Sequence, residues 1–413
     1  MTEPCDRSAT PRGEARTSLT WIVLPLMGTH ALGTVATTAL PTIAPEIARA
    51  YNISPALIGY QSSLVGGGFL VALLFLSNAR ERWGSCRVIQ AGMTLIGGSL
   101  LLALLPQLSF LVLASFGMGL GYGLMTPCAS HIMMRFTPSH QRNLVFSLQQ
   151  AGIPVGGILA AALIPAIALW AGWRWALGAN ALALFAMVAA LQPQRARWDD
   201  DRNRHARVMY QPLAGIGIIL RHRALRFMTI AGACFSAAQT CVTAFTVTAL
   251  VEELGYGLVQ AGFVLTAAQV AGVVFRIVSG WLADRTGEAM VVLAGLCGGL
   301  ALAGAASFAL SPAWPVIAVY ALFAAYGATS ISWPGAYLAE VARLSPPGRV
   351  SATIAGSLLL GNAGKIFGPV IFVYAYAATS SYAFGFGLLT VPAAVSLIYL
   401  LMARARLRSN DSL

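Results

Sequence analysis

The chain has 413 residues, of which 57% are hydrophobic and only 10% are charged. Soluble globular domains carry about 25% charged residues, so this composition excludes an ordinary soluble protein. In so apolar a chain the placement of charges matters more than their sum, and the net charge of +12 does not indicate a nucleic-acid partner. The six cysteines form no CxxC pair, so neither a metal site nor a disulfide framework is predicted.

Apolar stretches long enough to cross a bilayer follow one another along the chain. A span needs about 20 mostly apolar residues, and steps such as Ser54-Pro55 and Pro346-Pro347 mark the joints. We therefore predict an all-α membrane protein, with no room for a soluble catalytic domain of ordinary size. Twelve spans are expected, at 19–42, 55–79, 87–106, 108–134, 143–169, 173–193, 224–251, 258–282, 289–310, 313–339, 350–376 and 381–402.

Basic residues gather on one side of these spans. Of the 26 Lys and Arg residues, 22 fall in the tails and the even-numbered turns, whereas only Arg49 and Arg174 fall in the odd-numbered turns. Because cytoplasmic segments are enriched in Lys and Arg, both termini are predicted to be cytoplasmic.

The longest connection, roughly 194–222, divides the chain into two six-span halves, 1–193 and 223–413. It carries Asp199-Asp200-Asp201 among arginines and ends in an apolar run, Leu213 to Leu220, that we expect at the membrane interface.

The two halves resemble each other in sequence. The turn after the second span, Ser77–Gly84, and the turn after the eighth, Gly280–Gly287, share an acidic-Arg-x-Gly core. In each half a glycine lies 22 residues before the acid, Gly59 in the first and Gly262 in the second. Two parallel six-helix repeats are the architecture of one large class of transporters.

The segment Gly280–Gly287 matches the signature turn G-x-x-x-D-R-x-G of the major facilitator superfamily, and Gly152–Gly157 is similar to that family's Pro-Gly motif in span five. On these motifs and the twelve spans, the chain is identified as a member of this superfamily. The resemblance implies two pseudo-symmetric six-helix bundles, and we expect a monomer without a cofactor in a bacterial cytoplasmic (inner) membrane. One departure is Ser115 in span four, where many proton-coupled drug exporters of the family carry an arginine.

The resemblance also implies a role for the repeated turn. Each acid would latch its half to the first turn of a helix in the other half, Glu81 toward span eleven and Asp284 toward span five. Such a contact can exist in only one of two access states and would bias their equilibrium. The alternative is a surface ion pair worth less than about 1 kcal/mol. The predicted latch residues are Glu81, Arg82, Gly280, Asp284, Arg285 and Gly287.

Two cations fall inside predicted spans. Lys365, the only lysine, stands roughly 24 Å into span eleven from Arg349 at 1.5 Å per residue, and Arg276 lies in span eight. A cation in hydrocarbon costs about 2.5–3.5 kcal/mol, so each should face a wet cavity or a partner. Arg276 has the alternative of reaching Asp284, eight positions along nearly the same helix face. None of the 14 acidic residues falls near mid-span, so an anionic cargo is predicted to neutralise the two cations.

A finer resemblance points the same way. Arg276 ahead of Asp284-Arg285, with Lys365 ahead of Gly368-Pro369, resembles the oxalate:formate exchangers and monocarboxylate porters, in which an arginine and a lysine at these places hold substrate carboxylates. Segments 149–154 and 333–335 are similar to bacterial porters near the cyanate and nitrate-like group. The predicted substrate-binding residues are Arg276, Lys365, His30, Gln150, Gln239, Gln269 and Asn362.

Each polar residue in that set has an alternative role. Any one of them could be an interhelical hydrogen-bond partner rather than a ligand. His30 is the only side chain placed this deep that titrates near neutral pH, and it could carry a coupling proton or be a core histidine.

These features predict a secondary active transporter, not an enzyme, that moves a small organic anion by alternating access, and a carboxylate is the anion we expect. Either anion exchange or cotransport with a proton would balance the charge. The alternative is efflux of a hydrophobic or zwitterionic drug or metabolite, which the Gly152–Gly157 motif and the 9% aromatic content favour. A membrane-embedded enzyme or receptor lacks support, because the sequence shows no metal cluster, serine-histidine arrangement or signalling domain.

Overall fold

The computed structural model describes residues 20–76, 79–137, 149–203, 205, 213–347 and 349–411, and within them every regular element is a helix. Twelve helical stretches are long and apolar enough to cross a membrane, which confirms the predicted fold class. The first six, in chain order, are α1 (Thr20–Thr42), η1 with α3 (Pro55–Gly59, Tyr60–Phe75), α5 (Ser85–Leu102), α6 (Leu108–Phe136), α8 (Gly152–Ala171) and α9 (Trp173–Leu191). The last six are α12 (Arg223–Glu252), α13 (Leu258–Thr286), α14 (Ala289–Ser307), α15 with α16 (Val316–Ser330, Pro334–Arg343), α17 with α18 (Val350–Gly361, Ala363–Thr379) and α19 with α20 (Tyr382–Gly387, Thr390–Asp411).

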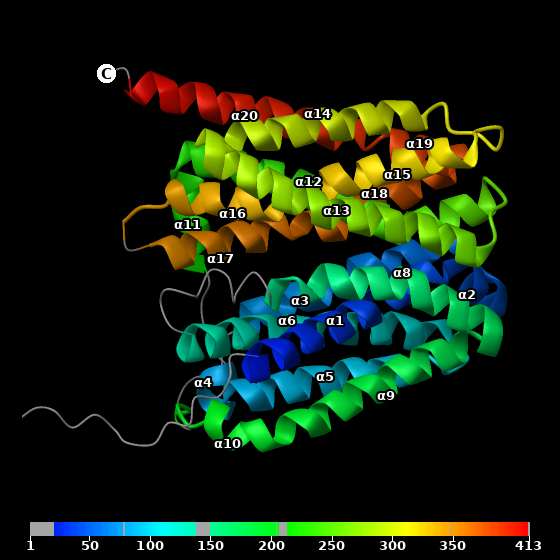
Figure 1. The fold of residues 1–413 in the computed structure, drawn as a ribbon, viewed down its shortest axis with the longest axis horizontal. Helices are drawn as coiled ribbons and strands as arrows, with labels where there is room; N and C mark the ends of the chain where they lie inside the picture. Colours follow the sequence, from blue (N-terminus) through cyan, green and yellow to red (C-terminus); the bar gives the residue numbers. More distant parts are fainter. Residues whose placement is uncertain are drawn as a thin grey trace, which may run out of the picture.

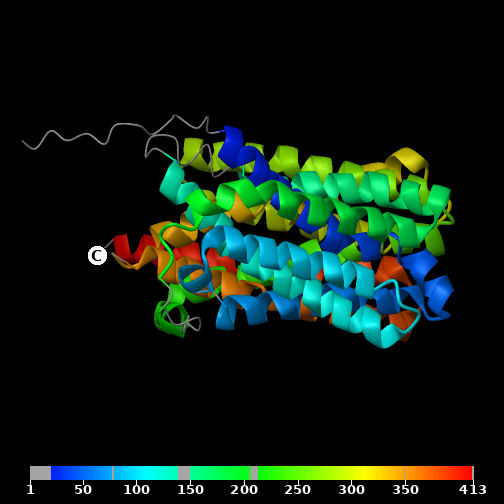
Figure 2. The same cartoon turned by 90° about the horizontal axis from the view of Figure 1, so that it is seen from below.

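The spans form two bundles that lie side by side (Figure 1), one drawn in blue to green and the other in green to red. Helix α1 begins and helix α20 ends at the same end of the molecule (Figure 2), which we call the terminal end. The opposite end, which we call the distal end, carries the short helix α2 (Ala44–Tyr51) and η1.

Small residues let the helices of each bundle approach closely. A methyl group on Gly119 of α6 would lie 2.0 Å from the carbonyl oxygen of Val65 in α3, and one on Gly327 of α15 would lie 1.8 Å from that of Ala268 in α13. The two crossings are equivalent, the fourth span against the second and the tenth against the eighth. Close backbone packing of this kind drives helix association in membranes, where lipid removes the usual hydrophobic gain.

The two halves meet along the distal part of their helices. Ser63 Oγ of α3 donates a hydrogen bond of 2.7 Å to the carbonyl oxygen of Ile366 in α18. A methyl group on Gly59 would lie 2.1 Å from Phe245 Cε1 of α12, and one on Gly262 of α13 would lie 2.5 Å from the carbonyl oxygen of Ala161 in α8. The halves are therefore closed against each other at the distal end.

Three spans are interrupted, although the sequence analysis expected continuous helices at 313–339, 350–376 and 381–402. The tenth span breaks at 331–333, just before Pro334, which has no N–H to donate to the preceding turn. The eleventh breaks at Asn362, and the twelfth between α19 and α20. The expected start of span five, 143–148, lies outside the described residues.

The segment that connects the two halves packs partly on the first half and partly on the second. Helix η3 (Gln192–Gln194) and α10 (Arg195–Trp198) continue from α9 on the first half. Helix α11 (Leu213–Arg221) packs on α17, where a methyl group on Gly215 would lie 2.1 Å from the carbonyl oxygen of Ala352. Its expected position at the membrane interface stays a prediction.

Candidate functional site

A cavity of about 180 Å³ lies between the two halves, near the middle of their helices. Its size compares with the apolar cavity of about 150 Å³ that holds a benzene molecule in another protein. The wall combines hydroxyl groups, two aromatic rings, two amides and two cations. Its principal polar and aromatic residues are Thr34, Thr37, Thr38, Phe69, Tyr122, Gln239, Thr240, Thr243, Gln269, Arg276 and Lys365.

A larger groove, of about 960 Å³, is confined to the first half, between α5, α6 and α9. Its wall is mainly apolar, and its single charged residue is Arg87. Of these two cavities, the central one is formed by both halves and holds both intramembrane cations, so we assign the candidate site to it.

Arg276 reaches the cavity from α13. Its Nη2 donates a hydrogen bond of 2.9 Å to the carbonyl oxygen of Ile331, at the break in the tenth span. Its Nε is buried and has no hydrogen-bond partner among the described residues. The alternative contact with Asp284 is not made, since the Asp284 side chain is exposed at the terminal end of the same helix. Arg276 therefore keeps hydrogen-bonding capacity beside the cavity.

Lys365 enters the cavity from the first turn of α18, directly after the break at Asn362. Its Nζ lies 5.4 Å from the centre of the Phe69 ring, a cation–π contact across the two halves. Among the described residues, neither Lys365 nor Arg276 forms an ion pair with an acid. The two cations therefore give the cavity wall a strong positive charge.

The two aromatic side chains of the wall, Phe69 and Tyr122, belong to the first half, whereas the two cations belong to the second. The Phe69 and Tyr122 rings are 6.1 Å apart and inclined by 40°. The Tyr122 hydroxyl is hydrogen-bonded to Thr34 Oγ1 at 3.1 Å. On the second half, Trp333 Nε1 donates to Gln239 Oε1 at 3.0 Å and holds that amide in place.

The cavity brings together four of the seven predicted substrate-binding residues, namely Arg276, Lys365, Gln239 and Gln269, whereas the other three lie outside its wall. His30 is buried behind Tyr122, with ring centres 6.1 Å apart, and its Nδ1 lies 3.1 Å from the carbonyl oxygen of Leu26. Asn362 donates to its own helix, at the carbonyl oxygen of Leu358. Gln150 has a buried Oε1 without a partner among the described residues.

The sequence analysis did not select several residues of the wall. Thr34, Thr37 and Thr38 lie at positions i, i+3 and i+4, which is one face of a helix. Thr243 of α12 also lies in the wall, three residues after Thr240. This polar stripe in an otherwise apolar span was the signal that could have identified them.

The predicted latch residues make no contact between the halves in the described part of the chain. Glu81 forms an ion pair with its neighbour Arg80 at 3.7 Å, and Arg82 is exposed. Asp284 is exposed, and Arg285 lies over the Trp281 ring at 5.2 Å. Gly287 ends α13 with φ of +67°, in the left-handed region that favours glycine. Gly280 lies within α13 with open space where a side chain would be.

The predicted latch lies at the terminal end, so we expect it to form in the access state in which that end is closed. In the present state the halves are closed at the distal end, where no latch is predicted. The first turn predicted for span five, the expected partner of Asp284, lies outside the described residues. The latch therefore stays a prediction.

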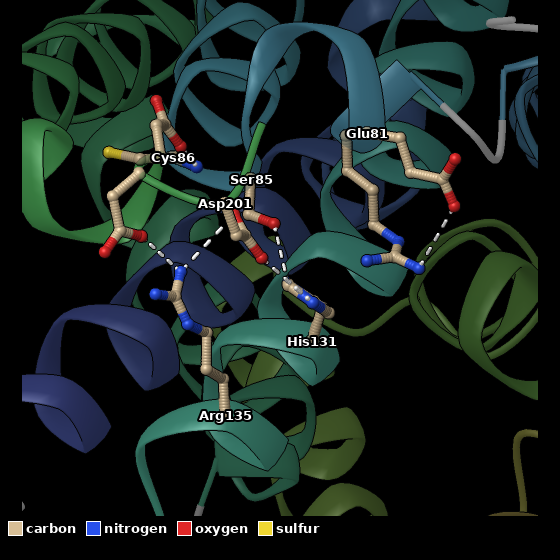
Figure 3. A network of polar contacts seen from close by, with 9 residues as sticks. Glu81, Ser85, Cys86, His131, Arg135 and Asp201 are labelled. Carbon is tan, nitrogen blue, oxygen red and sulfur yellow. Dashed lines mark hydrogen bonds and ion pairs between the residues drawn. The ribbon is translucent and has the colours of Figure 1, made fainter. Parts of the chain in front are cut away.

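A polar network does form at the terminal end, but within the first half (Figure 3). Arg135 of α6 forms ion pairs with Asp200 and with Asp201, the latter at 3.3 Å, and His131 Nε2 lies 3.4 Å from Asp201. Ser85 Oγ lies 3.1 Å from the other ring nitrogen of His131. The hydrogen bond from Arg135 holds the pKa of the Asp200 carboxyl below its usual value.

Asp199 connects the same segment to the start of α5. Its carboxylate accepts the backbone N–H groups of Cys86 at 2.6 Å and Arg87 at 3.2 Å, two donors that the first turn of a helix leaves unpaired. Burial raises the pKa of Asp199, an effect that these two hydrogen bonds offset only in part. The run of three aspartates thus fastens the beginning of the connection to the first half.

We expect Asp199→Ala to lower the free energy of unfolding by about 1–3 kcal/mol, because two buried N–H groups lose their acceptor. Asp199→Asn, which keeps one acceptor oxygen and removes a buried charge, should cost less. Asp200→Ala is the matched control, since its half-exposed ion pair is worth at most about 1 kcal/mol. Thermal unfolding in detergent measures the three variants, and equal losses for Asp199→Ala and Asp200→Ala would contradict the assignment.

Comparison with known proteins gives a family and several relatives. The model of the Major Facilitator Superfamily matches residues 26–369. A gentisate transporter of Corynebacterium glutamicum is 25% identical, over 79% of this chain and 74% of its own length. The 4-hydroxybenzoate transporter PcaK of Acinetobacter baylyi is 24% identical, over 79% and 81%. A gallate transporter of Pseudomonas putida is 25% identical, over 90% and 88%.

Among solved structures, a bacterial homologue of the human lysosomal transporter Spinster, in an inward-facing and unoccupied conformation, superposes with a TM-score of 0.71. It is 16% identical, and the match covers 96% of this chain and 99% of that one. The peptide transporter POT in complex with sulfate gives a TM-score of 0.71 at 16% identity, over 93% and 94% of the two chains. At these identities the likeness shows a shared fold.

Proposed function

Because the chain belongs to the major facilitator superfamily, we propose that it is a secondary active transporter whose cargo is a small aromatic carboxylate. The observation that carries this proposal is the pair of cations, Arg276 and Lys365, beside one ring-sized cavity with no acidic partner among the described residues. A carboxylate would neutralise them, and the faces of Phe69 and Tyr122 offer contacts to a ring.

The relatives support an aromatic anion. Gentisate, 4-hydroxybenzoate and gallate, named for three of them, are all hydroxylated benzoic acids. The finer resemblance to oxalate:formate exchangers and cyanate or nitrate-like porters agrees on negative charge but not on an aromatic ring. The aromatic wall favours the aromatic acid over oxalate.

The guanidinium and the ammonium would act differently on the cargo. Arg276 is held by Ile331 and presents a planar fork that suits two carboxylate oxygens. Lys365 is a point charge on a flexible stem over the Phe69 ring. Arg276 would set the orientation of the carboxylate, and Lys365 would complete its neutralisation next to the aromatic wall.

Transport would proceed by rocking of the two halves about this central cavity. With the termini in the cytoplasm of a bacterial inner membrane, as the distribution of arginines favours, the distal end faces outward, and the present state is closed to the outside. Charge balance would come from exchange for a second anion or from a cotransported proton. His30, one layer behind Tyr122, is the candidate proton carrier in the second scheme.

A competition assay in proteoliposomes tests the cargo. Vesicles loaded with unlabelled 4-hydroxybenzoate should accumulate the labelled acid, and benzoate, gentisate and gallate should compete with it. The neutral 4-hydroxybenzamide keeps the ring and hydroxyl but lacks the carboxylate, so it should compete at least about 10-fold less well, since hydrogen bonds to charged groups contribute about 1.5–3 kcal/mol. Competition by the amide or by lipophilic cations, without competition by the acids, would favour drug efflux instead.

A further inference from the structure

Five threonines line the central cavity, namely Thr34, Thr37 and Thr38 of the first half and Thr240 and Thr243 of the second. Thr34 is hydrogen-bonded to the Tyr122 hydroxyl at 3.1 Å, and the other four share a different arrangement. Thr37 and Thr38 of α1 donate their hydroxyl protons to the carbonyl oxygen of Thr34, at 3.1 and 2.7 Å. Thr240 and Thr243 of α12 do the same within their own helix, at 2.8 Å to the carbonyl oxygen of Ser236 and 2.9 Å to that of Gln239. Each of the four hydroxyl protons is therefore already used.

A threonine hydroxyl has one proton to donate and two lone pairs that can accept. With the proton bound to the helix backbone, only the lone pairs remain for a ligand. Arg276 and Lys365, in contrast, can only donate hydrogen bonds. The wall thus combines two kinds of group, donors that suit a carboxylate and acceptors that would repel a carboxylate and suit a hydroxyl proton.

We propose that these four threonines are a second subsite, which selects aromatic acids that carry a hydrogen-bond donor on the ring, the phenolic hydroxyl above all. This inference rests on the proposed function and adds the specificity of the same cavity. A hydroxybenzoate satisfies both kinds of group at once, with its carboxylate at Arg276 and Lys365 and its hydroxyl proton on a threonine oxygen. Benzoate leaves the threonine oxygens without a donor.

The threonines of the subsite come from both halves of the protein, which would couple cargo binding to the movement of the halves. Thr37 and Thr38 move with the first half, whereas Thr240 and Thr243 move with the second. Arg276 and Lys365 both belong to the second half. A ring hydroxyl bound by Thr37 or Thr38 therefore joins a cargo held by the second half to the first half. Hydroxylated cargo is then bound differently in the two access states, which is the condition for a ligand to shift their equilibrium.

Three acids that differ only at the para position separate the effect of a hydrogen-bond donor from that of size. The 4-hydroxybenzoate ring carries a donor, 4-methoxybenzoate carries an oxygen that can only accept, and benzoate carries neither. In the competition assay, the wild-type protein should bind 4-hydroxybenzoate roughly 2- to 10-fold more tightly than either analogue, the range expected for one neutral hydrogen bond.

The quadruple variant Thr37→Val/Thr38→Val/Thr240→Val/Thr243→Val should lose this preference while it still binds all three acids, because valine keeps the branched shape and removes all four acceptors. The matching quadruple serine variant keeps the hydroxyls and should retain it. Thr246→Val is the matched control in α12, since Thr246 is buried outside the cavity wall and bonds to Val242 of its own helix.

The outcomes separate this inference from the proposed function. Equal affinities of the wild type for the three acids would overturn the subsite and leave the carboxylate transporter standing. A preference that survives in the quadruple valine variant would also overturn it. Failure of every acid, benzoate included, to compete would overturn both. Loss of the preference in the valine variant alone supports the subsite.

Discussion

The Lys365→Gln variant is expected to lose most transport of aromatic carboxylates, with a half-saturation concentration roughly 10- to 100-fold higher than that of the wild type. A charged hydrogen bond contributes about 1.5–3 kcal/mol, and each 1.4 kcal/mol is a factor of ten. Glutamine is of similar length, so the Phe69 wall keeps its packing while the cation is lost. Uptake in proteoliposomes gives the rate, and the rise in melting temperature with added 4-hydroxybenzoate gives binding.

Charge and geometry can be separated with two further variants. Lys365→Arg keeps a cation and should retain more binding than Lys365→Gln. Arg276→Lys keeps the charge but loses the planar fork, so it should bind the acid more weakly than the wild type even though net charge is unchanged. Arg174→Gln is the matched control, because it removes an exposed cation of α9 far from the cavity wall. Wild-type uptake by Lys365→Gln would remove Lys365 from the site.

The two cations were accessible to sequence reasoning for a physical reason. A charge within an apolar span costs free energy wherever it faces lipid, so Lys365 and Arg276 are conspicuous against their neighbours. The threonines are not, because a hydroxyl that bonds to its own helix, as Thr38 does to Thr34, carries almost no such cost. Residues that lower the cost of their own burial leave little trace in hydropathy.

The number of spans followed from hydropathy, but the breaks within them did not. Pro334 starts α16 at a break, whereas Pro369 lies inside α18 and Pro127 inside α6 without ending either helix. A proline in the sequence was therefore not sufficient to predict where a helix breaks. The break at Asn362 has no proline at all, and it places Lys365 in the first turn of a helix. Asn362 keeps right-handed helical backbone angles and donates its N–H to the carbonyl oxygen of Leu358 at 2.9 Å, so this break sacrifices little backbone hydrogen bonding within the span.

The internal repeat identified Gly59 and Gly262 as equivalent positions, but their role needed the packing of the two halves. Each lies where its half touches the other at the distal end. At Gly59 the neighbour is an aromatic ring, Phe245, whereas at Gly262 it is the backbone of Ala161 with Pro165 beside it. A side chain can rotate away, but a helix backbone cannot. Gly262 is therefore the less tolerant of the two.

We expect Gly262→Leu to abolish transport by preventing closure of the distal end. The added side chain would meet the carbonyl oxygen of Ala161, where even a methyl group would lie at 2.5 Å. Overpacking costs typically about 1–3 kcal/mol, which shifts a two-state equilibrium by about 5- to 150-fold. The cost arises only when the distal end is closed, so the state open at that end should predominate.

Spin labels at Arg49→Cys in α2 and Glu252→Cys in α12, both exposed at the distal end, would report this shift once the native cysteines are replaced. Gly262→Leu should lengthen the mean distance between the labels and abolish uptake. Gly295→Leu is the matched control, because a side chain there enters open space on α14. An unchanged distance with lost uptake would place the defect in the cavity or in folding rather than in closure. A lengthened distance with normal uptake would mean that closure at Gly262 is not needed for transport, and the rocking scheme would have to be abandoned.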